Sequence, residues 1–195
     1  MTTPMLSART IAAALGQFPP TDEQVAVIEA PLEPALVVAG AGSGKTETMS
    51  ARVVWVVANA LVRRDEVLGL TFTRKAAGEL AERIHARLAR LAECERRGLL
   101  PHLGALHDAG ALDELFTIER DRDAGQIPEH ILEHRRATHL DRIAASVGAT
   151  AVDGDSDESM LHRPTVLTYN SFADAVVREN AVRVGRDPEV SVLSE

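Results

Sequence analysis

Residues 36–46 read Leu-Val-Val-Ala-Gly-Ala-Gly-Ser-Gly-Lys-Thr, an apolar run that passes into a glycine-rich loop ending in Gly-Lys-Thr. The segment Ala35 to Ala39 predicts a buried strand, and a helix is expected from about Gly44 to Leu61. Glycines allow the loop backbone to turn sharply, so that successive N–H groups point at phosphate oxygens. The N-terminus of the following helix adds unpaired N–H groups and a partial positive charge. The segment therefore predicts a loop that binds the phosphates of a nucleotide.

Two side chains at the end of this loop have predicted chemical roles. Lys45 is expected to reach the β- and γ-phosphates and the Thr46 hydroxyl to hold Mg²⁺, so these residues form the candidate catalytic and metal site. The strict pattern begins with glycine where this chain has Ala39, a position at which a small side chain suffices. The candidate nucleotide-binding residues of the loop are Ala39, Gly40, Ala41, Gly42, Ser43, Gly44, Lys45 and Thr46.

The composition predicts a soluble globular chain. Its 195 residues, 45% of them hydrophobic, can bury the core of one domain or of one domain with an elaboration. The longest nearly apolar run, residues 53–61, is far shorter than the roughly 20 residues of a membrane helix. Arg9 interrupts a weakly apolar patch over residues 5–15, so a secretory signal is not expected and the cytoplasm is the expected location. A single cysteine, Cys94, excludes an internal disulfide.

The net charge of −8 argues against nucleic-acid binding through overall basicity, but the charge is unevenly distributed. Residues 52–97 hold ten basic and six acidic side chains, a local charge of +4. Residues 98–163 hold six basic and thirteen acidic side chains, a local charge of −7. A polyanion is therefore expected to prefer the first of these segments.

Strands and helices alternate on both sides of a more charged middle segment. Further strands are predicted at Val67 to Phe72 and at Pro164 to Thr168. The middle segment contains charged helical pieces near residues 111–119 and 128–147, and its polar run over residues 153–159 predicts a mobile loop. Other helices are expected near Thr10 to Leu15, from Asp22 to Pro31 after the capping-box spacing of Thr21 and Gln24, from Arg74 to about Leu91, and from Ser171 to Val184.

This order predicts an α/β fold in which helices flank a parallel sheet, with a largely helical insertion. Four divisions are expected along the chain. They are a loose leader over residues 1–17, the first part of the core over 18–91, the acidic insertion over 92–163, and a return to the core over 164–195.

A second group of functional residues is predicted where a strand passes into a helix, at residues 71–77. Hydroxyl groups, backbone N–H groups at a helix N-terminus and an aromatic ring suit a phosphodiester backbone. Phe72 taken alone favours a core position, because aromatic residues in strands are usually packed. The candidate DNA-binding residues here are Thr71, Phe72, Thr73, Arg74 and Lys75.

With these motifs the sequence resembles the first motor domain of superfamily 1 DNA helicases of the UvrD/Rep/RecB type. Residues 18–24 are similar to the upstream element of the family, residues 39–46 to its phosphate-binding loop, and residues 71–77 to its first motif for single-stranded DNA. Residues 168–172 resemble the next such motif, in which the family commonly has His where this chain has Asn170. Residues 37–77 are most similar to the AdnB-type subunits of actinobacterial helicase-nucleases.

The resemblance implies a RecA-like nucleotide-binding core that uses ATP and Mg²⁺ and moves on single-stranded DNA, in DNA repair or recombination. It implies that Gln24 reads the adenine base, for which the amide supplies both a donor and an acceptor. Without the family, Gln24 is only a capping-box residue. The resemblance adds Thr168, Tyr169, Asn170 and Ser171 to the candidate DNA-binding residues, and a second helicase or nuclease subunit to the partners.

Hydrolysis in this family needs an acidic pair that holds Mg²⁺ and activates water, and no such pair is found before Glu195. The chain is therefore expected to be the N-terminal portion of a longer helicase that binds nucleotide but hydrolyses it poorly on its own. Two alternatives remain open. One is a non-catalytic, nucleotide-gated binding module completed by a partner, and the other is a small kinase with the same phosphate-binding loop.

A weaker motif lies in the middle segment. His130, Glu133 and His134 have the spacing of a zinc-peptidase motif, with both imidazoles on one helical face. No further ligand is apparent, and a solvated charged face is the preferred interpretation.

Overall fold

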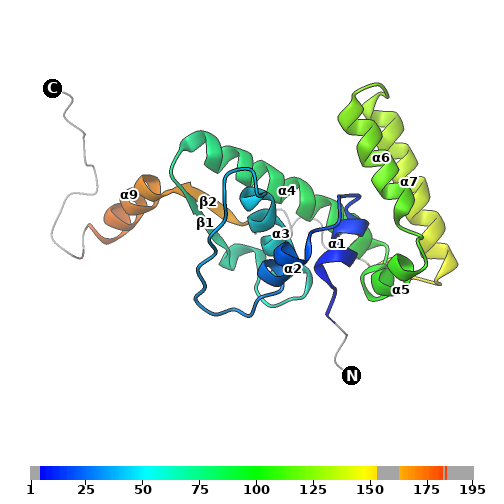
Figure 1. The fold of residues 1–195 in the computed structure, drawn as a ribbon, viewed down its shortest axis with the longest axis horizontal. Coiled ribbons are helices and arrows are strands. Elements are labelled where there is room, and N and C mark those ends of the chain that lie inside the picture. The colour runs from blue at the N-terminus through cyan, green and yellow to red at the C-terminus, as the bar shows by residue number, and fades with distance from the viewer. Residues whose placement is uncertain (1–4, 153–162, 182, 184–195) are drawn as a thin grey trace.

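The computed structural model describes residues 5–152, 163–181 and 183. Figure 1 shows an elongated chain, with a small sheet and its helices in the middle, a helical pair projecting at one end and a single helix at the other. The described helices are α1 (Ala8–Ala14), α2 (Asp22–Ile28), α3 (Lys45–Ala58), α4 (Arg74–Arg96), α5 (Leu103–Asp108), α6 (Asp113–Ala124), α7 (Glu129–Ser146) and α9 (Tyr169–Asn180). The strands are β1 (Leu68–Thr71) and β2 (Thr165–Thr168), and short 3-10 helices occupy Arg64–Glu66 and Leu100–His102.

The two strands form a parallel pair in which Leu68 lies opposite Thr165 and Thr71 lies opposite Thr168. Helix α4 follows β1 and packs against both strands, which is the connection that a parallel pair requires. Both strands lie within one residue of their predicted limits. This parallel pair, covered by α4, is compatible with the predicted α/β class, and the sheet has two strands within the described residues.

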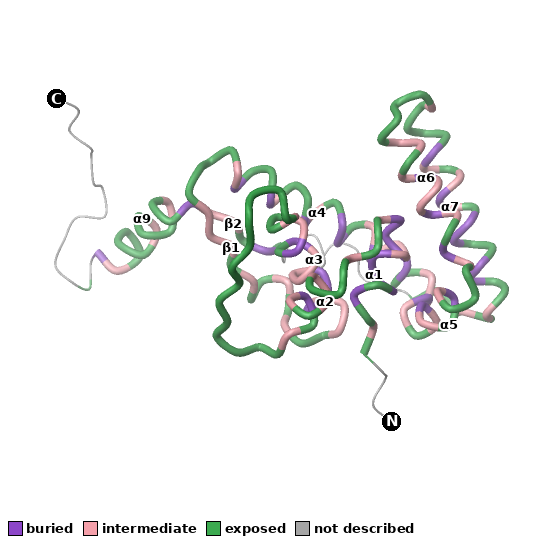
Figure 2. Tube along the Cα trace, viewed as in Figure 1, coloured by how far each residue is buried: buried purple, intermediate pink, exposed green. Residues whose placement is uncertain are grey.

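The strand predicted for Ala35 to Ala39 is absent, and this prediction is wrong. The segment between α2 and α3 is a long irregular connection without strand structure (Figure 2). Leu36 is 89% exposed and Val38 is 88% exposed. A strand needs a neighbour for its backbone N–H and C=O groups, and β1 and β2 pair only with each other in the described part of the chain. Local apolar pattern alone cannot supply that neighbour.

The predicted helices agree more closely with the structure. Helix α2 begins at Asp22 with both hydrogen bonds of the capping box, and α3 begins directly after Gly44. Helix α4 continues to Arg96, beyond its expected end near Leu91. Helix α9 begins two residues earlier than predicted and ends at Asn180, before its expected end at Val184, a residue that itself lies outside the described ones. The loop predicted at residues 153–159 also lies outside the described residues.

Two hydrophobic cores meet along α1 and α4. The first lies between α1, α2, α3 and α4 and includes Ile28, Trp55 and Ile84. The second lies within the middle segment and includes Leu103, Leu115 and Cys94, whose thiol is buried. Burial raises the pKa of the Cys94 thiol to about 11, so this thiol is un-ionised at neutral pH.

The expectation of a loose leader is wrong for its described part. Ile11 and Leu15 of the leader belong to the first core, and Ala14 belongs to the second. The Trp55 ring Nε1–H donates to the carbonyl of Leu6 at 2.8 Å, and the Asn59 side chain accepts from the amide of Leu6 at 2.7 Å. The segment before α2 is therefore fixed by buried apolar contacts and by hydrogen bonds to α3.

The projecting pair α6 and α7 is tied to α4 by buried and half-buried ion pairs. Arg136 on α7 has a side chain that is 0% exposed, and its Nε lies 2.8 Å from Glu93 on α4. Its Nη1 lies 3.3 Å from Glu119 on α6, and its Nη2 donates to the carbonyl of Ala14 at 3.2 Å. One guanidinium thus joins the leader, α4, α6 and α7.

His139 is buried on α7 and has two hydrogen-bond partners. Its Nε2 lies 2.9 Å from the carbonyl oxygen of Ala111, and Nη2 of Arg142 lies 2.6 Å from its Nδ1. Because a guanidinium only donates, Nδ1 must accept and the proton belongs on Nε2. Burial is the main cause that lowers the pKa of His139; the hydrogen bond to the Ala111 carbonyl opposes it, and the charge of Arg142 adds to it.

This environment predicts a pH-dependent stability of the middle segment. In the unfolded chain His139 titrates near pH 6.5, and in the folded chain it titrates lower, so the unfolded state binds more protons as the pH falls below that value. The stabilisation is complete above about pH 6.5 and is lost as the pH falls through the folded pKa. Urea unfolding at pH 7.5 and 5.5 measures this loss.

The variant His139→Gln is the control for that measurement. Glutamine retains a donor for Ala111 but does not titrate, so its unfolding free energy should change less between the two pH values. An identical pH dependence in both proteins would contradict the assignment to His139.

Candidate functional site

The glycine-rich loop turns into α3 through two glycines in the left-handed region. Gly42 has φ 79° and Gly44, the N-cap of α3, has φ 77°. A side chain at Gly44 would also place its Cβ 2.9 Å from Nε2 of Gln24. The left-handed backbone conformation thus favours glycine at residue 44, and a side chain there would also displace the Gln24 amide from the loop.

The Gln24 side chain contacts two parts of the chain, the start of α2 and the glycine-rich loop. Its side-chain Oε1 accepts from the backbone amide of Thr21 at 3.0 Å, and the backbone amide of Gln24 donates to the Thr21 hydroxyl at 3.3 Å. Its Nε2 donates to the carbonyl of Ser43 at 3.4 Å. The capping-box interpretation is confirmed, and the same side chain also contacts the phosphate-binding loop.

Lys45 folds back over the loop that precedes it. Its ammonium donates to the carbonyl of Ala39 at 3.1 Å and to that of Gly40, while the Ser43 hydroxyl donates to Gly40 at 2.9 Å. Thr46 lies exposed in the first turn of α3. The structure therefore brings together, in one exposed loop, an ammonium group, a hydroxyl and the N-terminus of a 14-residue helix.

The sequence analysis did not find the ion pair that lies directly after this loop. Glu47, the residue after Thr46, forms an ion pair with the buried Arg87 of α4 and lies 3.4 Å from Arg83. Arg87 also donates to the hydroxyl of Ser50. Burial lowers the pKa of Arg87, and Glu47 opposes that shift. The available signal was the position of Arg87 on the apolar face of α4, between Ile84 and Leu91.

Arg87 also reaches the leader. With the Gln17 amide oriented so that its oxygen faces α4, this oxygen accepts from Nε of Arg87 at 2.7 Å and from Nη2 at 3.1 Å. The buried guanidinium is thereby surrounded by acceptors from the leader and from α3, as a buried charge requires.

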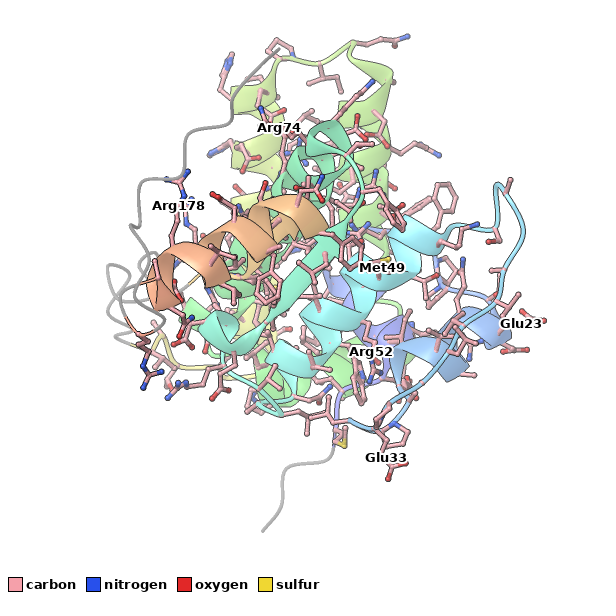
Figure 3. All side chains as sticks on the ribbon, turned by 90° about the vertical axis from the view of Figure 1, so that its left-hand side faces the viewer. Glu23, Glu33, Met49, Arg52, Arg74 and Arg178 are labelled. Carbon is pink, nitrogen blue, oxygen red and sulfur yellow. The ribbon has the colours of Figure 1, made fainter. Side chains whose placement is uncertain are left out.

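Arg52 on α3 fixes the chain that leads into the loop (Figure 3). Its Nη1 donates to the carbonyls of Val27, Ile28 and Ala30 at 3.1, 3.0 and 2.8 Å, and its Nη2 to that of Pro31 at 3.0 Å. These carbonyls lie at the C-terminal end of α2, where a cation is favourable. The contact holds α2, and with it Gln24, against α3.

The second group of predicted residues lies at the C-terminal ends of the two paired strands. Thr73 caps α4 by accepting from the amide of Ala76 at 3.1 Å, and Thr168 caps α9 by accepting from the amide of Ser171 at 3.0 Å. The rings of Phe72 and Tyr169 lie 5.2 Å apart with their planes tilted by 40°. Register brings Thr71 opposite Thr168, so the two motifs form one edge.

Phe72 is 87% exposed, so the core position that this residue alone favours is wrong. Tyr169 is half exposed, and Arg74, Lys75 and Asn170 are exposed. Arg74 lies at the outer end of α4 (Figure 3). This surface, which we call the aromatic edge, therefore presents the rings of Phe72 and Tyr169 and the charges of Arg74 and Lys75 to solvent. It lies between the capped N-termini of α4 and α9.

In the zinc-peptidase-like motif of the middle segment, Glu133 joins helices through ion pairs. Glu133 lies 2.8 Å from Nη2 of Arg90 and 2.7 Å from Nη2 of Arg122, and the hydrogen bond from Arg90 lowers its pKa. No cluster of three potential ligands is found in the described part of the chain. Within that same part, no helix is long and apolar enough to cross a membrane.

Comparison with known proteins decides the family. The model of the UvrD/REP helicase N-terminal domain matches residues 20–195, which is most of the chain. The chain belongs to this family. The match includes Gln24, the phosphate-binding loop and the aromatic edge, so all three groups of candidate residues lie within the UvrD/REP helicase N-terminal domain.

Similar proteins among curated sequences are DNA helicases. The chain is 38% identical over 86 residues to DNA helicase II of Haemophilus influenzae, which covers 44% of this chain and 12% of that protein. It is 45% identical over 65 residues to ATP-dependent DNA helicase UvrD2 of Mycobacterium tuberculosis, or 33% of this chain and 9% of that protein. The same identity and length relate it to UvrD1 of Mycobacterium leprae, of which it covers 8%. The matched part is thus about a tenth of these relatives.

Proposed function

We propose that this UvrD/REP helicase N-terminal domain is the ATP-binding portion of a motor that moves on single-stranded DNA. The observation that carries the proposal is the loop over residues 39–46, in which Lys45, Thr46 and the N-terminus of α3 meet beside Gln24. The order of loop, α3, β1, α4 and β2 supports a RecA-like arrangement for the core.

In this proposal the triphosphate of ATP lies against the backbone of residues 40–44. Lys45 exchanges the carbonyls of Ala39 and Gly40 for the β- and γ-phosphates, and these carbonyls now hold its ammonium close to the loop. Thr46 takes one position on Mg²⁺, a metal that suits oxygen ligands. Gln24 exchanges the Ser43 carbonyl for the edge of adenine and thereby favours ATP over GTP.

We propose further that the aromatic edge holds single-stranded DNA. Phe72 and Tyr169 offer faces on which bases stack without regard to sequence, and Arg74 and Lys75 offer charges to the phosphates. Helix α4 connects this edge to Arg87 and Glu47 beneath the nucleotide loop. A change of nucleotide state at the loop can thus alter the grip on DNA, which is the coupling that a DNA repair or recombination motor needs.

Turnover by this portion alone is expected to be slow. Glu47, which directly follows Thr46, forms ion pairs with Arg83 and Arg87. A water-activating carboxylate must be free to accept a proton. We propose that the missing acid and a second motor lobe act together with this portion in the active helicase.

Calorimetric titration tests the nucleotide half of the proposal. Mg-ATP should bind the purified chain more tightly than Mg-GTP, and single-stranded DNA should stimulate hydrolysis little. Absence of Mg-ATP binding would refute the proposed function, and strong DNA-stimulated hydrolysis would refute its catalytic part.

The DNA half predicts that Phe72→Ala and Tyr169→Ala each lower the affinity for an oligo-dT strand by about five-fold or more, since stacking of one base on an aromatic side chain contributes about 1–3 kcal/mol. Fluorescence anisotropy at fixed salt measures the affinity. Val177→Ala, which shortens an exposed apolar side chain on α9, is the control and should bind as the wild type does. Equal affinities for all four proteins would rule out the aromatic edge as the DNA site.

A further inference from the structure

The first turn of α3 carries a carboxylate next to the proposed site for phosphates and Mg²⁺. Glu47 directly follows Thr46, and its side chain is 47% exposed. A carboxylate in the first turn is favourable to the helix itself, because it lies at the positive end of the helix dipole. A triphosphate that binds the same helix N-terminus is also negative, and like charges this close repel each other. The site therefore needs a counter-charge for Glu47.

Two arginines of α4 supply this counter-charge. The Glu47 Oε1 pairs with Nη2 of Arg87, and its Oε2 lies 3.4 Å from Nη1 of Arg83. Each carboxylate oxygen thus has a guanidinium of its own, so two positive charges stand against one negative charge. In this arrangement Glu47 adds no net negative charge beside the loop.

Arg87 holds Glu47 more firmly than Arg83 does. The side chain of Arg83 is 41% exposed, and an exposed ion pair is loose and screened by salt. The side chain of Arg87 is 8% exposed and has further partners that fix it. Its Nη1 donates to the hydroxyl of Ser50 at 2.5 Å, and its Nε donates at 2.7 Å to the Gln17 amide oxygen, with that amide oriented toward α4. Arg87 is therefore the fixed counter-charge and Arg83 the weaker one.

Arg87 also contacts the backbone of the residue that it neutralises. Its Nη1 lies 3.5 Å from the carbonyl oxygen of Glu47, which accepts from the Ser50 hydroxyl at 2.9 Å as well. Arg87 lies in the middle of the 23-residue helix α4, on the face that is buried. One buried guanidinium thus holds both the carboxylate and the backbone of the residue that follows Thr46.

We propose that Arg87 is a positioning residue of the nucleotide site. It keeps the Glu47 carboxylate neutralised and turned toward α4, so that the first turn of α3 accepts the triphosphate together with Mg²⁺. Without Arg87, the freed carboxylate repels the phosphates. The inference rests on the proposed function, because it requires phosphates at Lys45.

Calorimetric titration of Mg-ATP into the whole chain tests this role. Arg87→Met should bind Mg-ATP about ten-fold more weakly at low salt, the order of effect expected for one unpaired charge near a protein surface. The double variant Arg87→Met, Glu47→Gln also lacks the guanidinium but frees no carboxylate, so its affinity should return to within about two-fold of the wild type. Added salt should shrink the difference between the wild type and Arg87→Met, because it screens the freed carboxylate.

Arg83→Met is the matched control, because it removes the other partner of the same carboxylate. It should lower the affinity by about two-fold or less, since exposed ion pairs contribute little. Arg87→Gln removes the charge but keeps a donor for Ser50, and it replaces the methionine variant should that protein unfold early. Urea unfolding of each variant shows that it is folded at the temperature of the titration.

The remaining outcomes overturn the inference. Equal losses in Arg87→Met and in the double variant would make Arg87 a structural residue that does not act through the charge of Glu47. Wild-type affinity in Arg87→Met would remove it from the nucleotide site, and a difference that salt leaves unchanged would exclude the repulsion. A loss in Arg83→Met as large as that in Arg87→Met would contradict the fixed counter-charge. These results all require wild-type protein that binds Mg-ATP, and its failure to bind would refute the proposed function and this inference with it.

Discussion

Replacing Lys45 with alanine is expected to lower the affinity for Mg-ATP by about 10- to 150-fold, since hydrogen bonds to charged groups contribute about 1.5–3 kcal/mol. The ammonium lies within reach of the loop carbonyls of Ala39 and Gly40, in the space where the β- and γ-phosphates are proposed to bind. Isothermal titration calorimetry with Mg-ATP measures the change. The side chain is exposed and contacts only loop carbonyls, so the far-UV spectrum and the unfolding midpoint should stay the same.

Lys75→Ala is the matched control. Lys75 is also an exposed lysine in the first turn of a helix, with a single loose ion pair to Glu79 at 3.8 Å. Its loss should leave ATP affinity unchanged and weaken binding of single-stranded DNA, whereas Lys45→Ala should leave DNA binding intact. Similar ATP affinities in the two variants would mean that the nucleotide does not use this loop.

Replacing Arg136 with methionine is expected to lower the free energy of unfolding by about 3–5 kcal/mol, the usual result of removing one partner from a buried ion pair. The guanidinium is 0% exposed and is shared by Glu93, Glu119 and the Ala14 carbonyl. Methionine fills much of the volume but takes one donor away from Glu93, Glu119 and the Ala14 carbonyl, and the two carboxylates keep only their pairs with Arg90 and Arg122. Urea unfolding followed by circular dichroism measures the loss.

The neighbouring Arg135→Met provides the control on the same helix. Arg135 is partly exposed and pairs with Glu114 and Asp121, each at 3.0 Å, at the surface of the helical pair. Exposed pairs contribute about 0–1 kcal/mol. The triple variant Arg136→Met, Glu93→Gln, Glu119→Gln should recover part of the stability, because it removes the unpaired charges together with the arginine. A loss for Arg136→Met no larger than that for Arg135→Met would contradict the structural role of the buried guanidinium.

Local features of the sequence predicted the parts of this fold that depend on local physics. The glycines of the loop specify left-handed turns, the Thr21 and Gln24 spacing specifies a helix start, and the apolar period of α4 specifies its buried face. The roles proposed for Lys45 and Thr46 rest on the same short pattern. None of these inferences requires knowledge of which distant segments meet.

The errors arose where distant segments decide the outcome. Leu36 and Val38 have the composition of a buried strand but lack a paired neighbour, and the leader lacks turn signals but is packed by Trp55 and the two cores. Arg87 pairs with Glu47 at the start of α3 although it lies about 40 residues farther along the chain. Its position on the apolar face of α4 indicated that it is buried, but the sequence does not show which partner it meets, because that depends on how α4 packs against α3.

Helix α4 is one uninterrupted element of 23 residues, or about 35 Å at 1.5 Å per residue. Its first turn carries Arg74 and Lys75, its middle carries Arg87 against Glu47, and its last turns carry Glu93 against Arg136. Because one helix carries all three groups, a rigid-body tilt of α4 would displace them together. The aromatic edge, the ion pair behind the glycine-rich loop and the projecting helices are therefore connected through a single helix.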